Sequence, residues 1–181
     1  MRTQSSEDRK RRARDFFEIE PERYCDLRLI YDVPADQVVV VLQPARRRQA
    51  ARTVSSPLTM DFTDDGLMIG IHLTPFVDPG THRYAVDLAR ALRPFKACDN
   101  ITSDDHGGYI QVRPWDPYDD EAAYGMNADA QFDLATDGGL IALRIARTTD
   151  EYELDPFISF FGLPWQAEVT NGDLLNQFGV F

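Results

Sequence analysis

The histidines and cysteines of this chain are the first residues to consider for chemistry, because they ligate metals and act as bases or nucleophiles. The three histidines are His72, His82 and His106, and none stands at the spacing of a His-x-x-x-His or Cys-x-x-Cys metal motif. Cys25 and Cys98 lie 73 residues apart, with no histidine near either one in the sequence. We therefore expect no metal site, no cofactor and no thiol nucleophile.

The two cysteines also bear on the compartment of the protein. A secreted disulfide scaffold carries a much higher density of cysteine, so we expect Cys25 and Cys98 to be reduced thiols in a cytoplasmic protein. A single bridge between them is the alternative. The first residues are polar and charged, without the apolar segment of a secretory signal, and no apolar run approaches the about 20 residues of a membrane helix.

The densest acidic groups are candidates for binding a cation or a basic partner. The segment 116–121 lacks the alternating oxygen ligands and the bend glycine of a calcium loop, and the run Asp104-Asp105-His106 lacks them too. We interpret both groups either as solvated loops or as an acidic face for a basic protein. The candidate binding residues here are Asp116, Asp119, Asp120 and Glu121.

Catalytic motifs are missing from the sequence. The nucleophile motif Gly-x-Ser-x-Gly, the phosphate loop Gly-x-x-x-x-Gly-Lys and the dinucleotide motif Gly-x-Gly-x-x-Gly are all absent. Asp61 with Asp65, and Asp133 with Asp137, could be imagined as paired acids. Each pair, however, brackets a predicted hairpin turn, where aspartate is an ordinary residue. We therefore expect no catalytic residues and no enzymatic activity.

A basic arm near the N-terminus is the main positive feature. Five cations fall within positions 9–14 of a predicted helix, and further arginines fall in the loop 46–52. Such runs bind phosphate backbones or the acidic surface of another copy of the chain. The alternative is a solubilising arm, because Asp8, Asp15 and Glu18 lie within pairing distance on a helix. The candidate binding residues here are Arg9, Lys10, Arg11, Arg12, Arg14, Arg46, Arg47 and Arg48.

Charge is divided unevenly along the 181-residue chain, whose formal net charge is -11. Residues 1–52 contain 12 Lys and Arg against 9 Asp and Glu, whereas residues 53–181 contain 7 against 21. An acidic body opposes the wrapping of duplex nucleic acid over most of its surface, and it is compatible with a basic partner protein. The 43% of hydrophobic residues is typical of a folded protein.

A sequence match at an offset of 72 residues divides the chain. Residues 60–73 align without a gap with residues 132–145, and both segments place Asp-Gly between alternating apolar runs. This pattern predicts a β-hairpin in each segment, with positive φ at Gly66 and Gly138. Gly70 and its counterpart in the second segment are both small, which indicates that something packs closely over that point.

A helix is expected before each hairpin. The first covers about residues 5–17. The second is opened by Pro79-Gly80-Thr81 and ended by Pro94, because an apolar stripe recurs there at helical spacing. That stripe consists of Tyr84, Leu88, Ala91, Leu92 and Phe95.

These elements predict an α+β fold of internally duplicated helix plus antiparallel β-sheet units, related by a pseudo-twofold axis. The first repeat unit, with the basic arm, covers residues 1–79, and the second covers residues 80–150. The aromatic-rich segment 151–181 is expected to pack across both units, so that the chain forms one compact domain, with Leu174-Leu175 in a last short helix.

Two stretches of the chain carry a family resemblance. They are Tyr31-Asp32-Val33-Pro34-Ala35-Asp36-Gln37-Val38-Val39-Val40 and Asp61-Phe62-Thr63-Asp64-Asp65-Gly66-Leu67-Met68-Ile69-Gly70-Ile71. Together they resemble the small prokaryotic "domain of unknown function 2283" over about residues 27–73, and residues 109–145 resemble it more weakly. The second stretch has Thr102-Ser103-Asp104-Asp105 where the family opens with Tyr-Asp. The resemblance supplies no catalytic residues, and because some members occur in gene pairs like toxin–antitoxin modules, it implies a binding role.

We therefore predict a non-enzymatic, cytoplasmic protein-binding module of the antitoxin, immunity or adaptor kind, whose acidic body binds a basic partner protein. One alternative is a nucleic-acid-associated protein that uses the basic arm 9–14 and the loop 46–52. Another is a small-ligand-binding or hydrolytic protein with a pocket between the units. No membrane association is expected, and a homo-oligomer is compatible with the sequence.

Overall fold

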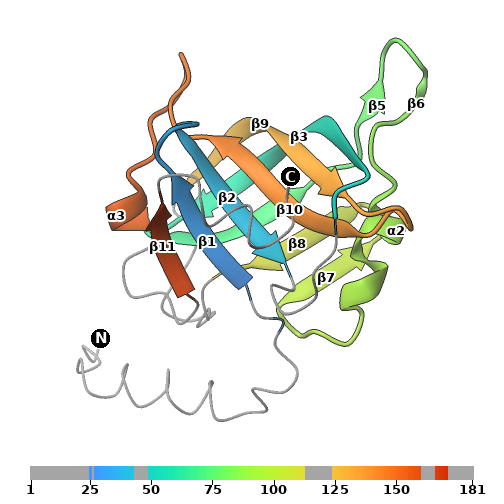
Figure 1. The fold of residues 1–181 in the computed structure, drawn as a ribbon, viewed down its shortest axis with the longest axis horizontal. Coiled ribbons are helices and arrows are strands. Elements are labelled where there is room, and N and C mark those ends of the chain that lie inside the picture. Colours follow the sequence, from blue (N-terminus) through green and yellow to red (C-terminus); the bar gives the residue numbers. More distant parts are fainter. Residues whose placement is uncertain (1–24, 26, 43–48, 113–123, 160–165, 171–181) are drawn as a thin grey trace, which may run out of the picture.

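The computed structural model describes residues 25, 27–42, 49–112, 124–159 and 166–170. Eight of its strands form one antiparallel sheet that curls into a half-barrel (Figure 1). Strand order in the sheet is β11-β1-β2-β10-β9-β3-β4-β8-β7, with β11 added parallel to β1 at one edge. The strands of the sheet are β1 (Leu27–Asp32), β2 (Gln37–Leu42), β3 (Arg52–Phe62), β4 (Met68–Leu73), β7 (Ile101–Asp104), β8 (Gly107–Gln111), β9 (Tyr124–Leu134), β10 (Leu140–Ala146) and β11 (Gln166–Thr170).

The predicted α+β fold of two duplicated helix-plus-sheet units is wrong, because the described part of the chain is mainly β. Both predicted hairpins belong to one continuous sheet, in which the 11-residue strands β3 and β9 pair along their whole length. Helical structure among the described residues is short: α2 (Leu88–Leu92), the 3-10 helix η2 (Arg93–Phe95) and α3 (Pro156–Ser159). The helix expected at 5–17 and the one expected at Leu174-Leu175 lie outside the described residues.

The helix expected between Thr81 and Pro94 is also wrong over its first half. A separate two-stranded ribbon, β5 (Val77–Asp78) and β6 (Arg83–Tyr84), projects from the body there (Figure 1). Tyr84 pairs with Val77 in this ribbon and is 65% exposed, so it does not continue the apolar stripe. The helix begins only at Asp87, whose side chain accepts a hydrogen bond from the Arg90 backbone N–H as an N-cap.

The two Asp-Gly hairpins are confirmed. Gly66 and Gly138 have φ angles of 82° and 83°, a region that glycine adopts at little steric cost. Their backbone N–H groups donate to the carbonyls of Thr63 and Ala135, which closes the two turns in the same way. The turns join β3 to β4 and β9 to β10 as antiparallel pairs.

Apolar residues alternate along the long strands and build the main core. In β3, Leu58, Met60 and Phe62 are buried on one face, because alternate side chains of a strand share a face. Inside the curled sheet they pack against residues from each of the other strands of the half-barrel. Strand β2 is buried on both faces. Val38, Val40 and Leu42 enter the main core, whereas Val39 and Val41 join a smaller outer cluster with Ile30, Ala135, Ile141 and Ala142.

The curl of the sheet brings its two ends together at a disulfide. Cys25 precedes β1 and is bonded to Cys98, which precedes β7. Asn100 adds two hydrogen bonds at this point: its Oδ1 accepts from the Cys25 N–H at 2.9 Å, and its Nδ2 donates to the Cys25 carbonyl at 3.1 Å. The expectation of two reduced thiols is therefore wrong, because Cys25 and Cys98 become neighbours only when the sheet curls.

Candidate functional site

The binding residues predicted from the sequence lie outside the part of the chain that the structure describes. The basic arm, the loop arginines and the acidic segment 116–121 are all among them. They are Arg9, Lys10, Arg11, Arg12, Arg14, Arg46, Arg47, Arg48, Asp116, Asp119, Asp120 and Glu121. Their assignment to a binding surface stays a prediction, and the candidate site that the structure does describe consists of other residues.

An aspartate–histidine pair joins strands β3 and β4. His72 Nε2 lies 3.0 Å from Oδ2 of Asp61, and the two side chains are 55% and 13% exposed. The sequence analysis assigned Asp61 only to a turn and did not connect it with His72. When the imidazole is neutral, donation from Nε2–H to the carboxylate leaves Nδ1 as a hydrogen-bond acceptor.

Tyr109 on β8 completes this group from the neighbouring strand. Its ring lies 4.5 Å from the His72 ring, centroid to centroid, and its hydroxyl bonds to Asp61. Burial raises the pKa of Tyr109 well above its usual value, and the adjacent Asp61 carboxylate raises it further, so the hydroxyl stays protonated and donates. The expected close packing over Gly70 is this ring: a Cβ at Gly70 would lie 2.0 Å from the Tyr109 hydroxyl.

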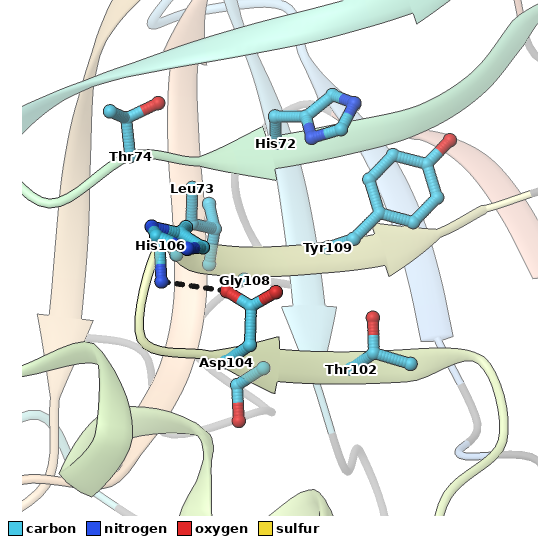
Figure 2. Close-up of a pocket in the computed structure, with 10 residues that line it drawn as sticks. His72, Leu73, Thr74, Thr102, Asp104, His106, Gly108 and Tyr109 are labelled. Atoms are coloured by element: carbon cyan, nitrogen blue, oxygen red, sulfur yellow. Dashed lines mark hydrogen bonds between the residues drawn. The ribbon is translucent and has the colours of Figure 1, made fainter.

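A pocket of about 350 Å³ opens beside His72 and Tyr109, on the face of the sheet opposite the main core. Two rows of paired residues cross strands β4, β8 and β7 here (Figure 2). The first row is His72, Tyr109 and Thr102, and the second contains Gly107 and Asp104 beside Thr74. His106, in the turn between β7 and β8, lies at the other side of the pocket (Figure 2).

Gly107 lines the pocket in the second row, where the backbones of β8 and β4 approach each other closely. Its φ is +152°, and a Cβ there would lie 2.4 Å from the backbone oxygen of Leu73. Only glycine fits this close approach of two strands. At the rim, Asp104 Oδ1 accepts a hydrogen bond of 2.7 Å from the His106 backbone N–H, which fixes the carboxylate on the pocket side of β7 (Figure 2).

In the other half of the sheet, the corresponding row of residues is largely buried. There the row Ile30, Val39 and Arg144 crosses β1, β2 and β10, and both Ile30 and Val39 are fully buried. Arg144 takes the place of His72 and pairs with Asp133, which also accepts from the Thr53 hydroxyl at 2.6 Å. The polar, exposed row with a hollow beside it is therefore a local feature of β4, β8 and β7.

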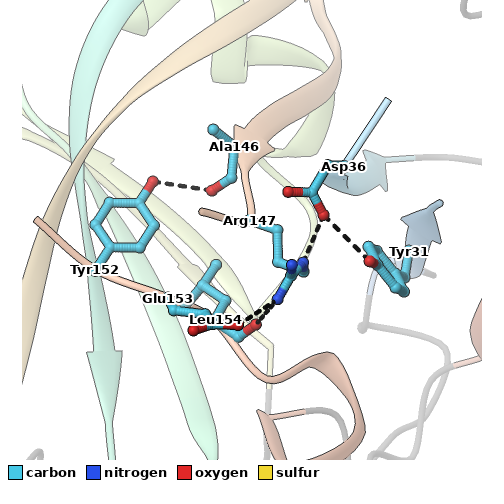
Figure 3. Close-up of polar contacts among 7 residues, drawn as sticks. All are labelled: Tyr31, Asp36, Ala146, Arg147, Tyr152, Glu153 and Leu154. Atoms are coloured by element: carbon cyan, nitrogen blue, oxygen red, sulfur yellow. Dashed lines mark hydrogen bonds and ion pairs between the residues drawn. The ribbon is translucent and has the colours of Figure 1, made fainter. Parts of the chain in front are cut away.

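A second hollow, of about 510 Å³, lies between β1 and the segment that follows β10. Its charged groups are bonded to one another. Arg147 Nε donates to Asp36 at 2.5 Å and its Nη1 donates to Glu153 at 2.9 Å, while the Tyr31 hydroxyl also donates to Asp36 (Figure 3). This network anchors residues 147–154 to the β1–β2 turn, and we interpret it as structural.

Three other residues considered in the sequence analysis, His82, Asp65 and Asp137, do not line the pocket of about 350 Å³. His82 lies in the turn of the projecting ribbon with a φ of 55°. Asp65 and Asp137 make turn contacts, with the Thr63 hydroxyl and the Gly139 N–H respectively. Within the described ranges, no group of three or more His, Cys, Asp and Glu side chains is arranged to hold a metal ion.

Sequence reasoning missed Tyr109, Thr102 and Gly107 as parts of one site. The only signal was the small residue at Gly70, which indicated close packing but not its source. Tyr109 reaches Gly70 through the pairing of β4 with β8, whose paired residues lie about 37 positions apart along the chain, as His72 and Tyr109 do. Pairing between strands so far apart in the sequence depends on how the whole sheet assembles, and no local sequence pattern specifies it.

Comparisons of the chain with protein-family models, with curated proteins and with solved structures find no match. The resemblance to the "domain of unknown function 2283" stays a prediction. Among the described residues, no helix combines the length and the hydropathy needed to cross a bilayer.

Proposed function

We propose that this chain is a non-enzymatic binding protein of the adaptor or antitoxin kind, and that it binds its partner protein through the outer face of β4, β8 and β7. The observation that carries this proposal is the pocket at His72, Tyr109 and Thr102. It lies where the other half of the sheet presents the row Ile30, Val39 and Arg144, in which Ile30 and Val39 are fully buried. Concave sites with a few fixed polar groups are the usual places for recognition.

The chemistry of the pocket also favours binding over catalysis. A hydrolytic site with a histidine base needs a nucleophile at the base and donors for the developing oxyanion. Here the hydroxyl of Tyr109, whose ring contacts the His72 ring, donates to Asp61 and is not placed as a nucleophile at the imidazole. The Asp61–His72–Tyr109 group therefore orients an aromatic and polar surface.

Thr102 offers the cleanest way to block this surface. It is exposed on β7, and its side chain lies at the end of the row that lines the pocket. Thr102→Trp places a large side chain over the hollow with a residue that suits a strand. Gln131→Trp is the matched control, because Gln131 is also an exposed strand residue but lies on β9, three strands from β8.

The test is affinity capture from an extract of the source organism with the wild-type chain, Thr102→Trp and Gln131→Trp. Captured proteins and nucleic acids are quantified in the same eluates at low and high salt. We expect a protein that the wild type and Gln131→Trp retain and that Thr102→Trp loses by about tenfold or more, since a central blocked contact removes over 1.4 kcal/mol. Equal capture by Thr102→Trp, or salt-sensitive capture of nucleic acid alone, would overturn the proposal.

A further inference from the structure

We infer that the pocket beside Gly107 is a site for a basic side chain, the guanidinium of arginine or the ammonium of lysine, presented by a partner protein. This inference names the ligand chemistry of the binding face and rests on the proposed function. Three observations support it: the polar atoms that line the pocket, its charge, and the aromatic ring at its side.

The Asp104 carboxylate is a fixed hydrogen-bond acceptor at the pocket. Asp104 uses Oδ1 to accept from the His106 backbone N–H, and its second carboxylate oxygen stands on the pocket side of β7 (Figure 2). In its neutral form, with Nε2–H donating to Asp61, His72 would add Nδ1 as a second acceptor. Arginine and lysine side chains carry donors and no acceptor, so they match such a lining.

The charge of the pocket agrees with this match. Its ten lining residues include the Asp104 carboxylate and neither lysine nor arginine. Two more carboxylates stand nearby: Asp61 behind His72, and Asp105, which is exposed in the adjoining turn. An anionic ligand would meet these carboxylates without a cation to offset them, whereas a cationic side chain gains a charge-assisted hydrogen bond from Asp104.

The ring of Tyr109 supplies the remaining contact. Its hydroxyl end packs over the backbone of Gly70, and the His72 ring lies beside it at a tilt of 50°. A guanidinium or ammonium over an aromatic face is attracted by the ring quadrupole. The pocket of about 350 Å³ leaves room for the aliphatic part of the side chain between this ring and Thr74.

The decisive experiment titrates the full chain with N-acetylarginine amide and, separately, with N-acetylcitrulline amide, which has nearly the same shape without the charge. Amide chemical shifts of His72, Thr102, Asp104 and Tyr109 report binding. The variant Asp104→Asn removes the charge but keeps an acceptor for the His106 N–H, so the turn is retained. Asp150→Asn, an exposed carboxylate in another turn, is the control.

We expect the arginine amide, and not the citrulline amide, to shift these four signals, with an affinity about tenfold lower for Asp104→Asn and unchanged for Asp150→Asn, as for loss of one charge-assisted hydrogen bond. Equal shifts by citrulline, or unchanged affinity in Asp104→Asn, would overturn the cation site. If Thr102→Trp still abolishes partner capture in that case, the proposed function stands. If the arginine amide binds but capture ignores Thr102→Trp, the proposed function falls and the cation site stands.

Discussion

Arg144 on β10 donates from Nε to Oδ2 of Asp133 on β9 across 2.6 Å, and this pair lies almost entirely inside the protein. Only 10% of the Arg144 side chain and 1% of the Asp133 side chain are exposed. The corresponding pair on the neighbouring hairpin, His72 and Asp61, is 55% and 13% exposed. We therefore expect the buried pair Arg144–Asp133 to contribute more to stability than the exposed pair His72–Asp61.

Arg144→Met should destabilise the protein by about 3 kcal/mol or more, because it leaves the buried Asp133 carboxylate without its cation. His72→Met should cost less than about 1 kcal/mol, since an exposed pair contributes little. Urea unfolding of both variants measures the difference. Comparable losses of stability in the two variants would show that exposure does not distinguish the pairs.

Gly70→Ala should destabilise the protein by about 1–3 kcal/mol, the usual cost of overpacking. A Cβ at this position would lie 2.0 Å from the Tyr109 hydroxyl, so the ring must leave its place beside His72 and its bond to Asp61. In a Tyr109→Ala background the same substitution should cost almost nothing. A double-mutant cycle by chemical denaturation measures this coupling, and additive effects would refute the packing of Tyr109 over Gly70.

Reduction of the Cys25–Cys98 disulfide should lower the free energy of unfolding by about 4 kcal/mol, because the bond closes a loop of 73 residues. Urea midpoints with and without a thiol reductant, and for the variant in which both cysteines are serine, measure the effect. The reductant should leave the serine variant unchanged. Alkylation of both thiols in native, unreduced protein would show that the bridge is absent.

Asp36 should make the fold sensitive to acid. The hydrogen bond from Arg147 holds the pKa of Asp36 below its usual value of 3.8, against the opposing effect of burial and with a further hydrogen bond from Tyr31. A carboxyl with a lowered folded-state pKa stabilises the fold above its unfolded pKa, and this contribution is lost as the pH falls through the folded value.

The measurement is the melting temperature of the wild type and of Asp36→Asn between pH 7 and pH 2. The wild type should be the more stable at pH 7 by a small margin, since the Asp36 side chain is 45% exposed. The margin should shrink once the pH falls below about 3.8 and disappear in strong acid. A margin that is constant over this range would show that the Arg147 contact does not favour the charged form.

Local patterns in the sequence predicted the hairpins well. Asp-Gly between alternating apolar runs specifies a turn within a few residues, and the positive φ of Gly66 and Gly138 follows from that turn alone. The apolar alternation beside the first turn corresponds to the buried face of β3, where Met60 and Phe62 lie. The helix before the second hairpin was overestimated, since the apolar spacing from Tyr84 to Phe95 could not show that Tyr84 would pair with Val77 in an exposed ribbon.

The sequence by itself thus determined the turns, the strand faces and the match between residues 60–73 and 132–145. Only the tertiary structure decided that both hairpins join one sheet along β3 and β9, where Pro57 lies opposite Asp129, and that Cys25 meets Cys98. The pocket was decided at the same level, because its residues come from three strands. Turn and strand preferences act over a few residues, whereas sheet pairing and curl depend on burying apolar faces from the whole chain at once.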